Sequence, residues 1–423
     1  MKKSSIILLS SFLALSLLGC SGNQNESSGS NGKPSASNQA QESWMDVKSL
    51  KSVYVDTGIF DHIGFAVPAA NLTKQNIIEG VKYHASSFTL ENETKPDTFM
   101  RKFANGLSGG DLESFTSSNG LTVAVPKQDK LNYVTLDNAM QIAKDNGLMM
   151  RGHVLVWHSQ TPKAFFCEDY SPSNQYVSPA EMDARQEWYI KSVLEHITAW
   201  ESANNNGKRI IYAWDVVNEA LSDSANAVNY LRDSTSSPWY AIYQSGDYIV
   251  NAFRYANKYA PEDVLLAYND YNEFQGDKHN GYLKIIDSIL AAKDDKLLPA
   301  RIDIAGMQSH NQTGWPSSQE YEACIQHFID KGLDVQITEL DITGSWKGGN
   351  NFERAEPDAQ KRTYYNYFKL YQKYRKTQSS HGITGITFWG ISDETSWRGS
   401  ASPLLFKFYK TKPAYYGVIQ AAE

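Results

Sequence analysis

Eight short runs of strand-forming residues, each followed by a segment with helical spacing, constrain the fold of this 423-residue chain more than any other feature. Each run ends in polar or charged residues, and the runs lie at 62–69, 87–93, 148–158, 211–219, 265–271, 302–310, 335–341 and 385–393. Strands that alternate with helices favour parallel βαβ units. Eight such units predict an α/β fold, a (β/α)8 TIM barrel in a single domain.

The segments between the runs have the period of amphipathic helices. Apolar residues recur at i, i+3, i+4 and i+7 in 249–256 and again in 321–329, after which Gly332 stands where a C-cap glycine is expected. Because no Gly-rich phosphate loop follows any run, a dinucleotide-binding sheet is disfavoured. Two long irregular stretches, 103–130 and 163–182, follow strands and should decorate the C-terminal face of the barrel.

The N-terminus has the pattern of a targeting signal. Two lysines precede a mostly apolar run at 6–18, and the sequence Leu-Leu-Gly-Cys then ends at Cys20. An apolar run this short, ending in small residues, is typical of a secretory signal rather than a spanning helix. A cysteine directly after Leu-Gly resembles a bacterial lipobox, in which that cysteine is lipidated. We therefore expect residues 1–20 to be a lipoprotein signal peptide and Cys20 to carry the lipid.

The next segment differs sharply in composition from the rest of the chain. Residues 21–45 are rich in Ser, Asn and Gly, which predicts a flexible tether, and residues 46–423 form the folded domain. The sequence thus predicts a secreted protein, lipid-anchored to a bacterial cell membrane or outer surface. Membrane contact is expected only through this N-terminal anchor.

Composition excludes several classes of function. The net charge is −7 and no Lys/Arg stripe is present, so no nucleic-acid partner is expected. Cys167 and Cys324 are too few for a disulfide framework, and no cluster has metal-ligand spacing. No G-x-S-x-G nucleophile elbow is visible. We expect no metal, no cofactor, and a monomer.

Carboxylates, imidazoles and indoles gather where the predicted strands end. Barrel enzymes place their active sites at this face, so seven strands ending in this way indicate catalysis rather than packing. Sugar rings present C–H faces to Trp and Tyr and hydroxyl rims to Asn, Gln, His, Lys and Glu. Cleavage of a glycosidic bond needs one protonated and one ionised carboxyl group. The mixture therefore suits a carbohydrate substrate.

Two motifs then become specific. The segment 214–219 (WDVVNE) resembles the acid/base motif of glycoside hydrolase family 10, and 337–341 (ITELD) resembles its nucleophile motif. Further segments match the family in order and position, and the resemblance runs from about residue 60 to the end. These segments are 91–95, 151–153, 157–160, 269–272, 306–310, 389–397 and 403–406.

The resemblance implies an endo-β-1,4-xylanase that hydrolyses internal bonds of xylan and xylo-oligosaccharides with retention of configuration. It assigns Glu219 as acid/base and Glu339 as nucleophile. A retaining mechanism predicts that their carboxyl groups lie about 5–5.5 Å apart. The family also places His310 between Asp341 and Glu339, so Asp341→Ala should lower activity without unfolding the protein.

The same resemblance implies substrate contacts. Asn218 should bond the sugar 2-OH beside the scissile bond, Trp389 and Trp397 should wall the −1 subsite, and Tyr271 should lie toward the aglycone side. The glycone side would be lined by Glu91, Asn92, Lys95, His158, Gln308 and His310.

The sequence departs from the family in two places. Ala164 stands where the family usually has Trp, so an aromatic surface is lost unless Phe165 or Phe166 replaces it, and the stretch 103–130 is longer than expected. Two other functions stay open. A cellulase or mannanase of a related barrel family would share both glutamates, whereas a surface glycan-binding lipoprotein without catalysis would not need them.

Overall fold

The computed structural model describes residues 41–423 except 104 and 350. The predicted signal peptide, the lipidation site Cys20 and the tether up to residue 40 lie outside the described residues. Across the described part of the chain, no helix is both long and apolar enough to cross a membrane.

Eight parallel strands form a closed barrel, which confirms the predicted (β/α)8 fold. β11 pairs with both β1 and β10, and this double pairing closes the sheet. The barrel strands, in chain order, are β1 (His62–Val67), β2 (Ser87–Leu90), β5 (Met149–Trp157), β6 (Ile211–Asn218), β7 (Leu265–Asp270), β8 (Ile304–Met307), β10 (Asp334–Thr343) and β11 (Ile383–Phe388). The sixth predicted run differs, because a separate short strand, β9 (His310–Gln312), follows β8 and pairs with the end of β10.

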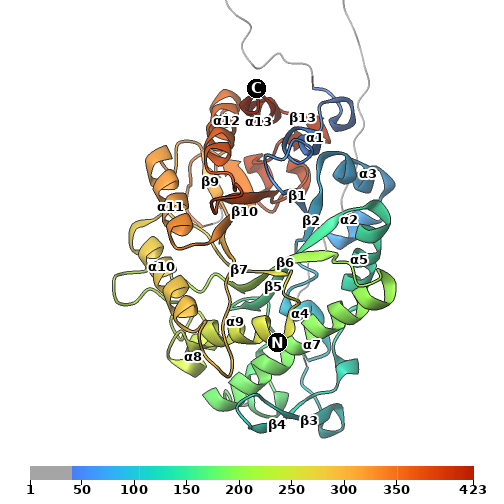
Figure 1. Ribbon diagram of the computed structural model, residues 1–423, viewed down its shortest axis with the longest axis vertical. Helices are drawn as coiled ribbons and strands as arrows, with labels where there is room; N and C mark the ends of the chain where they lie inside the picture. Colours follow the sequence, from blue (N-terminus) through green and yellow to red (C-terminus); the bar gives the residue numbers. More distant parts are fainter. Residues whose placement is uncertain (1–40, 104, 350) are drawn as a thin grey trace, which may run out of the picture. The chain divides into compact units, whose positions relative to one another are not determined.

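Helices surround the barrel (Figure 1). The predicted helical segments 249–256 and 321–329 lie within α9 and α11, and Gly332 follows α11 with a φ of +78°. The α-helices are α1 (Leu50–Tyr54), α2 (Ala69–Leu72), α3 (Gln75–His84), α4 (Pro96–Phe99), α5 (Val134–Asn146), α6 (Lys163–Phe166), α7 (Pro179–Asn204), α8 (Pro238–Tyr243), α9 (Asp247–Tyr259), α10 (Gly276–Ala291), α11 (Ser318–Asp330), α12 (Pro357–Lys373) and α13 (Pro413–Ala421).

The stretch 103–130 is ordered by a β-hairpin. β3 (Leu112–Thr116) and β4 (Thr122–Pro126) pair antiparallel, and their turn docks on α7. There the backbone N–H of Ser118 donates to Glu187 (2.6 Å) and the Asn119 amide donates to Asp183 (2.6 Å). A second small hairpin, β12 (Phe406–Lys407) and β13 (Lys410–Thr411), precedes α13.

The first described residues already contact the barrel domain. Trp44, assigned by the sequence to the tether, is 4% exposed, and its ring lies 5.9 Å from the rings of both His84 and Phe406. A Cβ added at Gly80 would lie 1.9 Å from the Trp44 ring, so the fit between them is close. Packed structure therefore begins a few residues before position 46.

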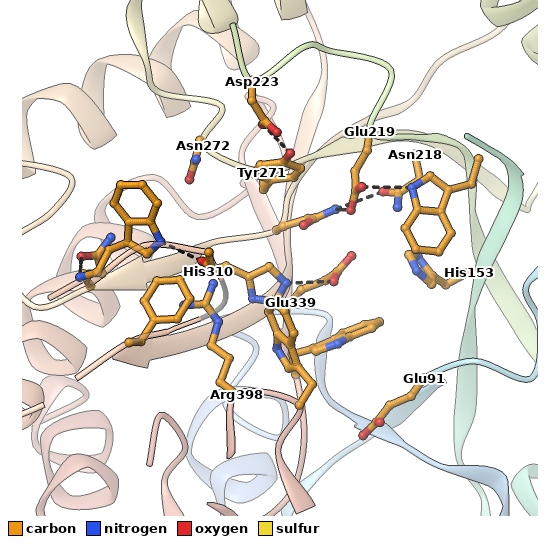
Figure 2. A pocket seen from close by; sticks show the side chains of 18 of the residues that line it. Glu91, His153, Asn218, Glu219, Asp223, Tyr271, Asn272, His310, Glu339 and Arg398 are labelled. Atoms are coloured by element: carbon orange, nitrogen blue, oxygen red, sulfur yellow. Dashed lines mark hydrogen bonds and ion pairs between the residues drawn. The ribbon is translucent and has the colours of Figure 1, made fainter. Parts of the chain in front are cut away.

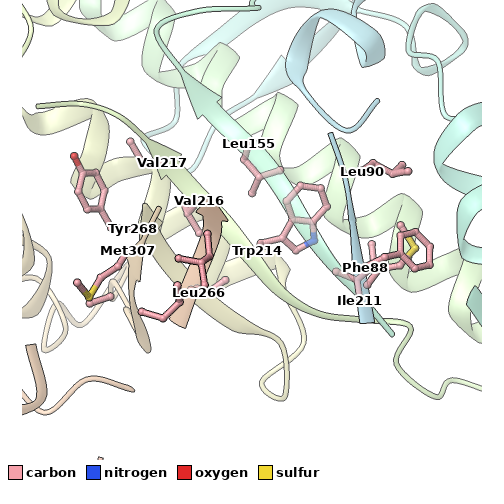
Figure 3. Packing of buried hydrophobic residues seen from close by; sticks show 14 of the residues in the cluster. Phe88, Leu90, Leu155, Ile211, Trp214, Val216, Val217, Leu266, Tyr268 and Met307 are labelled. Atoms are coloured by element: carbon pink, nitrogen blue, oxygen red, sulfur yellow. The ribbon is translucent and has the colours of Figure 1, made fainter. Parts of the chain in front are cut away.

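The core between strands and helices is closely packed, as Figure 3 shows for Trp214 and its neighbours. Trp214 on β6 is buried and pairs in register with Gly152 on β5. A Cβ at position 152 would lie 2.2 Å from the Trp214 ring, a distance that real atoms do not reach. Glycine at this position therefore makes room for the indole.

Inside the barrel, below the strand ends, lies a buried polar cluster. The Arg151 guanidinium forms two hydrogen bonds to the Asp215 carboxylate and donates through Nε to Gln336 (2.9 Å). His153 Nδ1 lies 2.9 Å from the same carboxylate. Burial alone would raise the pKa of Asp215, but Arg151 and His153 outweigh it and hold that pKa below its usual value. Arg151 thus connects three strands, its own β5 with β6 through Asp215 and with β10 through Gln336.

We expect Asp215→Ala to destabilise the fold by about 3–5 kcal/mol, because it leaves the Arg151 guanidinium buried without a counter-charge. Urea unfolding followed by circular dichroism measures the change. Asp263→Ala is the matched control, since that carboxylate is exposed and pairs with Arg209 at 3.1 Å; it should cost less than about 1 kcal/mol. Equal losses in the two variants would contradict the special role of the buried pair.

Candidate active site

A cleft of about 1140 Å³ opens where the barrel strands end. Glu219, Glu339 and most of the other predicted site residues line it, and Figure 2 shows Glu219 and Glu339 between Tyr271 on one side and Glu91 on the other. The predicted residues in its lining are Glu91, Asn92, Lys95, Asn218, Glu219, Tyr271, Gln308, His310, Glu339, Trp389 and Trp397.

Glu219 directly follows β6 and turns out of the strand with a φ of +53°, which is uncommon for a residue other than glycine. Its backbone N–H donates to the Asn269 carbonyl (2.9 Å). Its carboxylate accepts hydrogen bonds from Trp157 Nε1 (3.0 Å) and Gln308 Nε2 (3.0 Å). Arg232 donates to the Glu219 carbonyl (2.8 Å) and places a positive charge 3.9 Å from the carboxylate. Backbone and side chain are both fixed.

Glu339 lies within β10 and is more buried than Glu219, with 6% of its side chain exposed against 16%. It accepts from Asn269 Nδ2 (2.8 Å) and contacts His310 Nε2 at 3.2 Å. Burial would raise its pKa, but the hydrogen bond to His310 and the charges of His153 and His310 outweigh it, so the pKa lies below the usual value. Glu339 is therefore held as a carboxylate.

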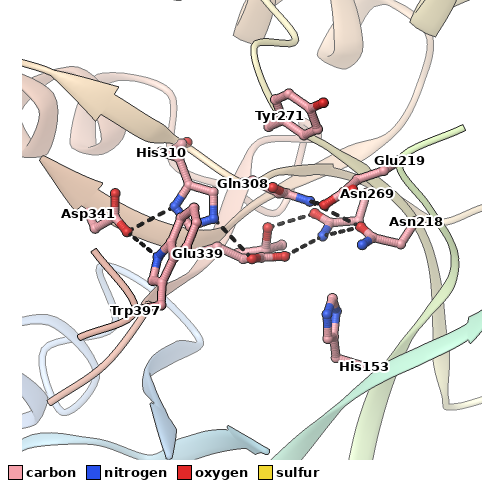
Figure 4. Close-up of polar contacts among 12 residues, drawn as sticks. His153, Asn218, Glu219, Asn269, Tyr271, Gln308, His310, Glu339, Asp341 and Trp397 are labelled. Atoms are coloured by element: carbon pink, nitrogen blue, oxygen red, sulfur yellow. Dashed lines mark hydrogen bonds and ion pairs between the residues drawn. The ribbon is translucent and has the colours of Figure 1, made fainter. Parts of the chain in front are cut away.

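Amide side chains connect the two carboxylates (Figure 4). Gln308 Nε2, which bonds Glu219, also donates to Asn218 Oδ1 (3.1 Å), and Asn269 Nδ2, which bonds Glu339, donates to the same oxygen (3.0 Å). Thr338 Oγ1 donates to Asn269 Oδ1 (2.6 Å) and so fixes the orientation of that amide. Asn218, Gln308 and Asn269 together set the relative positions of the two acids.

His310 lies between Glu339 and Asp341, as the sequence predicts. Its Nδ1 lies 3.0 Å from Asp341, and Asp341 also accepts from Trp397 Nε1 (2.9 Å) and pairs with Arg398 (3.2 Å). Burial lowers the pKa of His310, but Asp341 and Glu339 raise it to about 9. The imidazole is therefore a cation at neutral pH. Asp341 lies inside β10 and is wholly buried, so it does not cap the strand.

The end of the cleft away from Tyr271 is formed by Glu91, Asn92 and Lys95. Lys95 Nζ donates to Asn92 Oδ1 (3.0 Å) and lies 4.8 Å from the centre of the Trp157 ring. Burial lowers the pKa of Lys95, although Glu339 and Glu219 oppose the effect. Burial and Glu93 raise the pKa of Glu91 to about 7, while Lys95 opposes that rise. This end presents donors and acceptors suited to hydroxyl groups.

Tyr271 is fixed from several directions. Arg232 donates to its hydroxyl (2.9 Å), the hydroxyl donates to Asp223, and the Lys278 ammonium lies 3.4 Å from the ring centre. Lys278 is in turn paired with the buried Asp270 at 3.1 Å. One face of the ring is covered by the ammonium group, and Tyr271 lines the cleft.

His158 is the predicted contact that the structure places outside the cleft lining. It lies next to the Glu219 carbonyl, and burial together with Arg232 lowers its pKa to about 4. The cleft is lined instead by His153 and Trp157 from the same strand. His153 and Trp157 are an even number of residues apart on β5, and His158 comes after the last residue of that strand.

The cleft lining also contains residues that were not predicted as site residues. Among them, Arg398, Trp315, Trp346 and Phe352 come from loops, where side-chain direction has no sequence period. Ala164 is 1% exposed, and Phe165 and Phe166 are wholly buried, so neither phenylalanine replaces the missing aromatic surface.

Within residues 41–423, positions 104 and 350 apart, no group of three side chains could hold a metal ion.

Two carboxylates in unequal surroundings, set among indoles and amides at the mouth of a TIM barrel, define a glycoside hydrolase. The family model described as glycosyl hydrolase family 10 matches residues 49–421. The chain belongs to this family.

Known members are similar over most of the chain. Endo-1,4-beta-xylanase A of Butyrivibrio fibrisolvens is 34% identical over 380 residues, 86% of this chain and 82% of that protein. Endo-1,4-beta-xylanase Y of Acetivibrio thermocellus is 33% identical over 87% of this chain, which spans 32% of that protein. This chain likewise spans 31% of the bifunctional endo-1,4-beta-xylanase XylA of Ruminococcus flavefaciens. It therefore covers about a third of the length of these two longer relatives.

Among solved structures, the endo-1,4-beta-D-xylanase 10B of Clostridium thermocellum, solved as CBM22-1 and GH10 modules with xylohexaose, matches with a TM-score of 0.73. The two are 32% identical, and the match covers 89% of this chain and 68% of that one.

We expect Asp341→Asn to shift the alkaline limb of the kcat/KM–pH profile toward lower pH by about one unit or more, because a nearby carboxylate raises the pKa of a histidine by this amount. The folded-state pKa of His310 is raised, so its charge is complete at low pH and is lost as pH rises through about 9. Arg398→Gln should move the limb the other way, since the Arg398 charge lowers the same pKa. Identical profiles in both variants would contradict this account.

Proposed function

We propose that this protein is an endo-β-1,4-xylanase that cleaves internal bonds of xylan with retention of configuration, with Glu339 as nucleophile and Glu219 as acid/base. The observation that carries the proposal is the unequal environment of the two carboxylates. Glu339 is buried beside the His310 cation and has a lowered pKa, as a nucleophile requires. Glu219 is more exposed than Glu339. Arg232 contacts both Glu219 and Tyr271, and Tyr271 lies on the predicted leaving-group side.

In the first step, a Glu339 oxygen attacks the anomeric carbon and the bond from that carbon to the leaving oxygen breaks. Glu219 gives its proton to the leaving oxygen. In the second step, Glu219 removes a proton from water, and the resulting oxygen nucleophile displaces Glu339 from the anomeric carbon. Two inversions give net retention, and both carboxyl groups return to their starting protonation states.

The surrounding groups would act on charge and orientation. The amide of Asn218 is oriented by Asn269 and Gln308, so its Nδ2 is directed for a hydrogen bond to the sugar 2-OH. Hydrogen bonds of this kind strengthen as the ring flattens and contribute several kcal/mol to transition-state stabilisation. Trp389 and Trp397 supply apolar walls, and Lys95, Asn92 and Glu91 hydrogen-bond further units on the glycone side.

Xylan is favoured as substrate over cellulose or mannan because the relatives are named as xylanases and one matching structure was solved with xylohexaose. A purely glycan-binding role is disfavoured, because Trp157, Gln308, Asn269 and His310 position both carboxylates, and binding alone does not need this.

We expect the two glutamates to separate by role under mutation. Glu339→Ala should abolish turnover of every substrate, and added azide should give an inverted glycosyl azide. Glu219→Ala should lose roughly 10²–10⁴-fold on xylan, the usual contribution of a general acid, but should still react with an aryl xyloside whose leaving group needs no proton. Azide should then give a product of retained configuration.

Glu113→Ala, which removes an exposed carboxylate on β3, serves as control and should be fully active. Product configuration by proton NMR is the measurement. Inverted products from the wild type, or a separation of about 9 Å between the two carboxyl groups, would refute the retaining assignment.

We also propose that the mature protein is secreted and lipid-anchored through Cys20, since the lipobox-like Leu-Leu-Gly-Cys is followed by a polar, tether-like composition. Expressed from the full sequence in a bacterial host, the wild type should fractionate with membranes and incorporate labelled palmitate. Cys20→Ala should do neither. The control Cys167→Ala, a buried cysteine of the folded domain, should label like the wild type. Equal labelling of Cys20→Ala would exclude lipidation at this residue.

A further inference from the structure

The loop after β10 presents an exposed tryptophan to the cleft. Trp346 lines the cleft and is 57% exposed, whereas Trp389, close to Glu339, is 8% exposed. A large apolar ring left this open to water is uncommon and calls for a ligand or a role in packing. The surroundings of Trp346 decide between these two.

Hydrogen bonds hold the ring in place. The backbone N–H of Trp346 donates to Gln312 Oε1 (2.8 Å), and its indole N–H donates to the Gly349 carbonyl (2.8 Å). The loop closes as a small hairpin, with an antiparallel bridge between Trp346 and Phe352 and a turn in which Gly348 and Gly349 have φ values of +104° and +55°. Both N–H donors of Trp346 are satisfied, one by Gln312 of β9 and one within the loop, so the ring face remains available.

The hairpin is also attached to the catalytic surroundings. The Arg398 guanidinium stacks on the Phe352 ring at 4.0 Å and pairs with Asp341 at 3.2 Å. Asp341 in turn contacts His310. Phe352, Arg398, Asp341 and His310 thus form a continuous series of contacts that fixes the hairpin of Trp346 relative to Glu339.

Trp346 belongs to the end of the cleft that Tyr271 occupies. Its partner Gln312 is bonded through the backbone to Trp315, and Trp315 packs edge-on against Phe274 at 4.7 Å. Phe274 follows Tyr271 by three residues in the same loop. Glu91 lies at the other end of the cleft in Figure 2.

We propose that Trp346 forms an additional sugar-binding position on the leaving side of the cleft, beyond the unit that contacts Tyr271. This rests on the proposed function above. The ligand is a β-1,4-linked xylopyranose unit, whose C–H face stacks on the indole. Hydroxyl partners are at hand, because Asn272, Gln275 and Ser345 line the same end of the cleft.

Binding at this position favours long substrates over short ones. The segment Ala164–Phe166 exposes no aromatic surface to a substrate, since all three residues are buried. Added contact on the leaving side therefore biases productive binding toward cleavage with several units beyond the scissile bond. Contact with a remote unit of the substrate lowers the barrier at the bond that is cleaved.

The test compares wild type, Trp346→Ala and Trp346→Phe on xylohexaose and on an aryl β-xylobioside, whose leaving group has no further sugar. Trp346→Ala should lower kcat/KM for xylohexaose about tenfold, equivalent to ~1.4 kcal/mol. It should also move the preferred cleavage site toward a shorter leaving segment, and leave the aryl substrate unchanged within about twofold. Trp346→Phe, which keeps an aromatic face, should recover most of the loss.

Phe408→Ala is the matched control, because Phe408 is 66% exposed and lies outside the cleft lining. It should match the wild type on both substrates, and thermal unfolding checks that every variant is folded. Unchanged xylohexaose kinetics in Trp346→Ala, or equal losses on the two substrates, would overturn the sugar-binding position while the proposed xylanase activity stands. A wild type inactive on xylohexaose would overturn the proposed function and this position together.

Discussion

The Asp215 carboxylate, buried inside the barrel, is the group on which the geometry of the site depends. It neutralises Arg151, which also bonds Gln336, and it contacts His153. Removing one partner of such an ion pair is costly, because the other is left as an uncompensated charge in a medium of low polarisability. The arrangement does more than hold three strands together. It orients the His153 ring, which packs against Trp389 at 5.3 Å and contributes to keeping Glu339 ionised. The floor of the cleft and the nucleophile are therefore one electrostatic unit.

Above this floor, neutral amides and different neighbouring charges, Arg232 beside Glu219 and His310 beside Glu339, give the two carboxylates different properties. Asn269 and Gln308 reach both acids through Asn218, so a shift in one strand end would move all of them together. His310 and Asp341 add charge on the Glu339 side only. Two identical functional groups can then carry out opposite tasks, because their surroundings and not their chemistry differ. The loops contribute Tyr271 and Trp346, which are fixed by their own hydrogen bonds and do not disturb this centre.

Much of this could be predicted from the sequence, for identifiable reasons. Strands and helices have different periods, so eight units were visible, and polar residues that end strands must meet at one face of a barrel. The family resemblance predicts His158 as a substrate contact, whereas His153 and Trp157 of the same strand appear in the cleft lining. The hairpin in 103–130 and the position of Trp346 depend on contacts with α7 and Gln312, which are distant in sequence. Local patterns carry no signal for such contacts.

The pairing of Gly152 with Trp214 has a consequence for how sequences of this kind can diverge. The indole occupies the volume that any side chain at 152 would need, and the two residues lie directly opposite each other on β5 and β6. A larger residue at 152 is tolerable only after the tryptophan has become smaller, and the smaller residue alone would leave a void. Each single step thus lowers stability while the double step need not. The two positions should drift as a coupled pair, and a lineage that crosses between the two solutions must either pass through a weakened intermediate or change both residues at once.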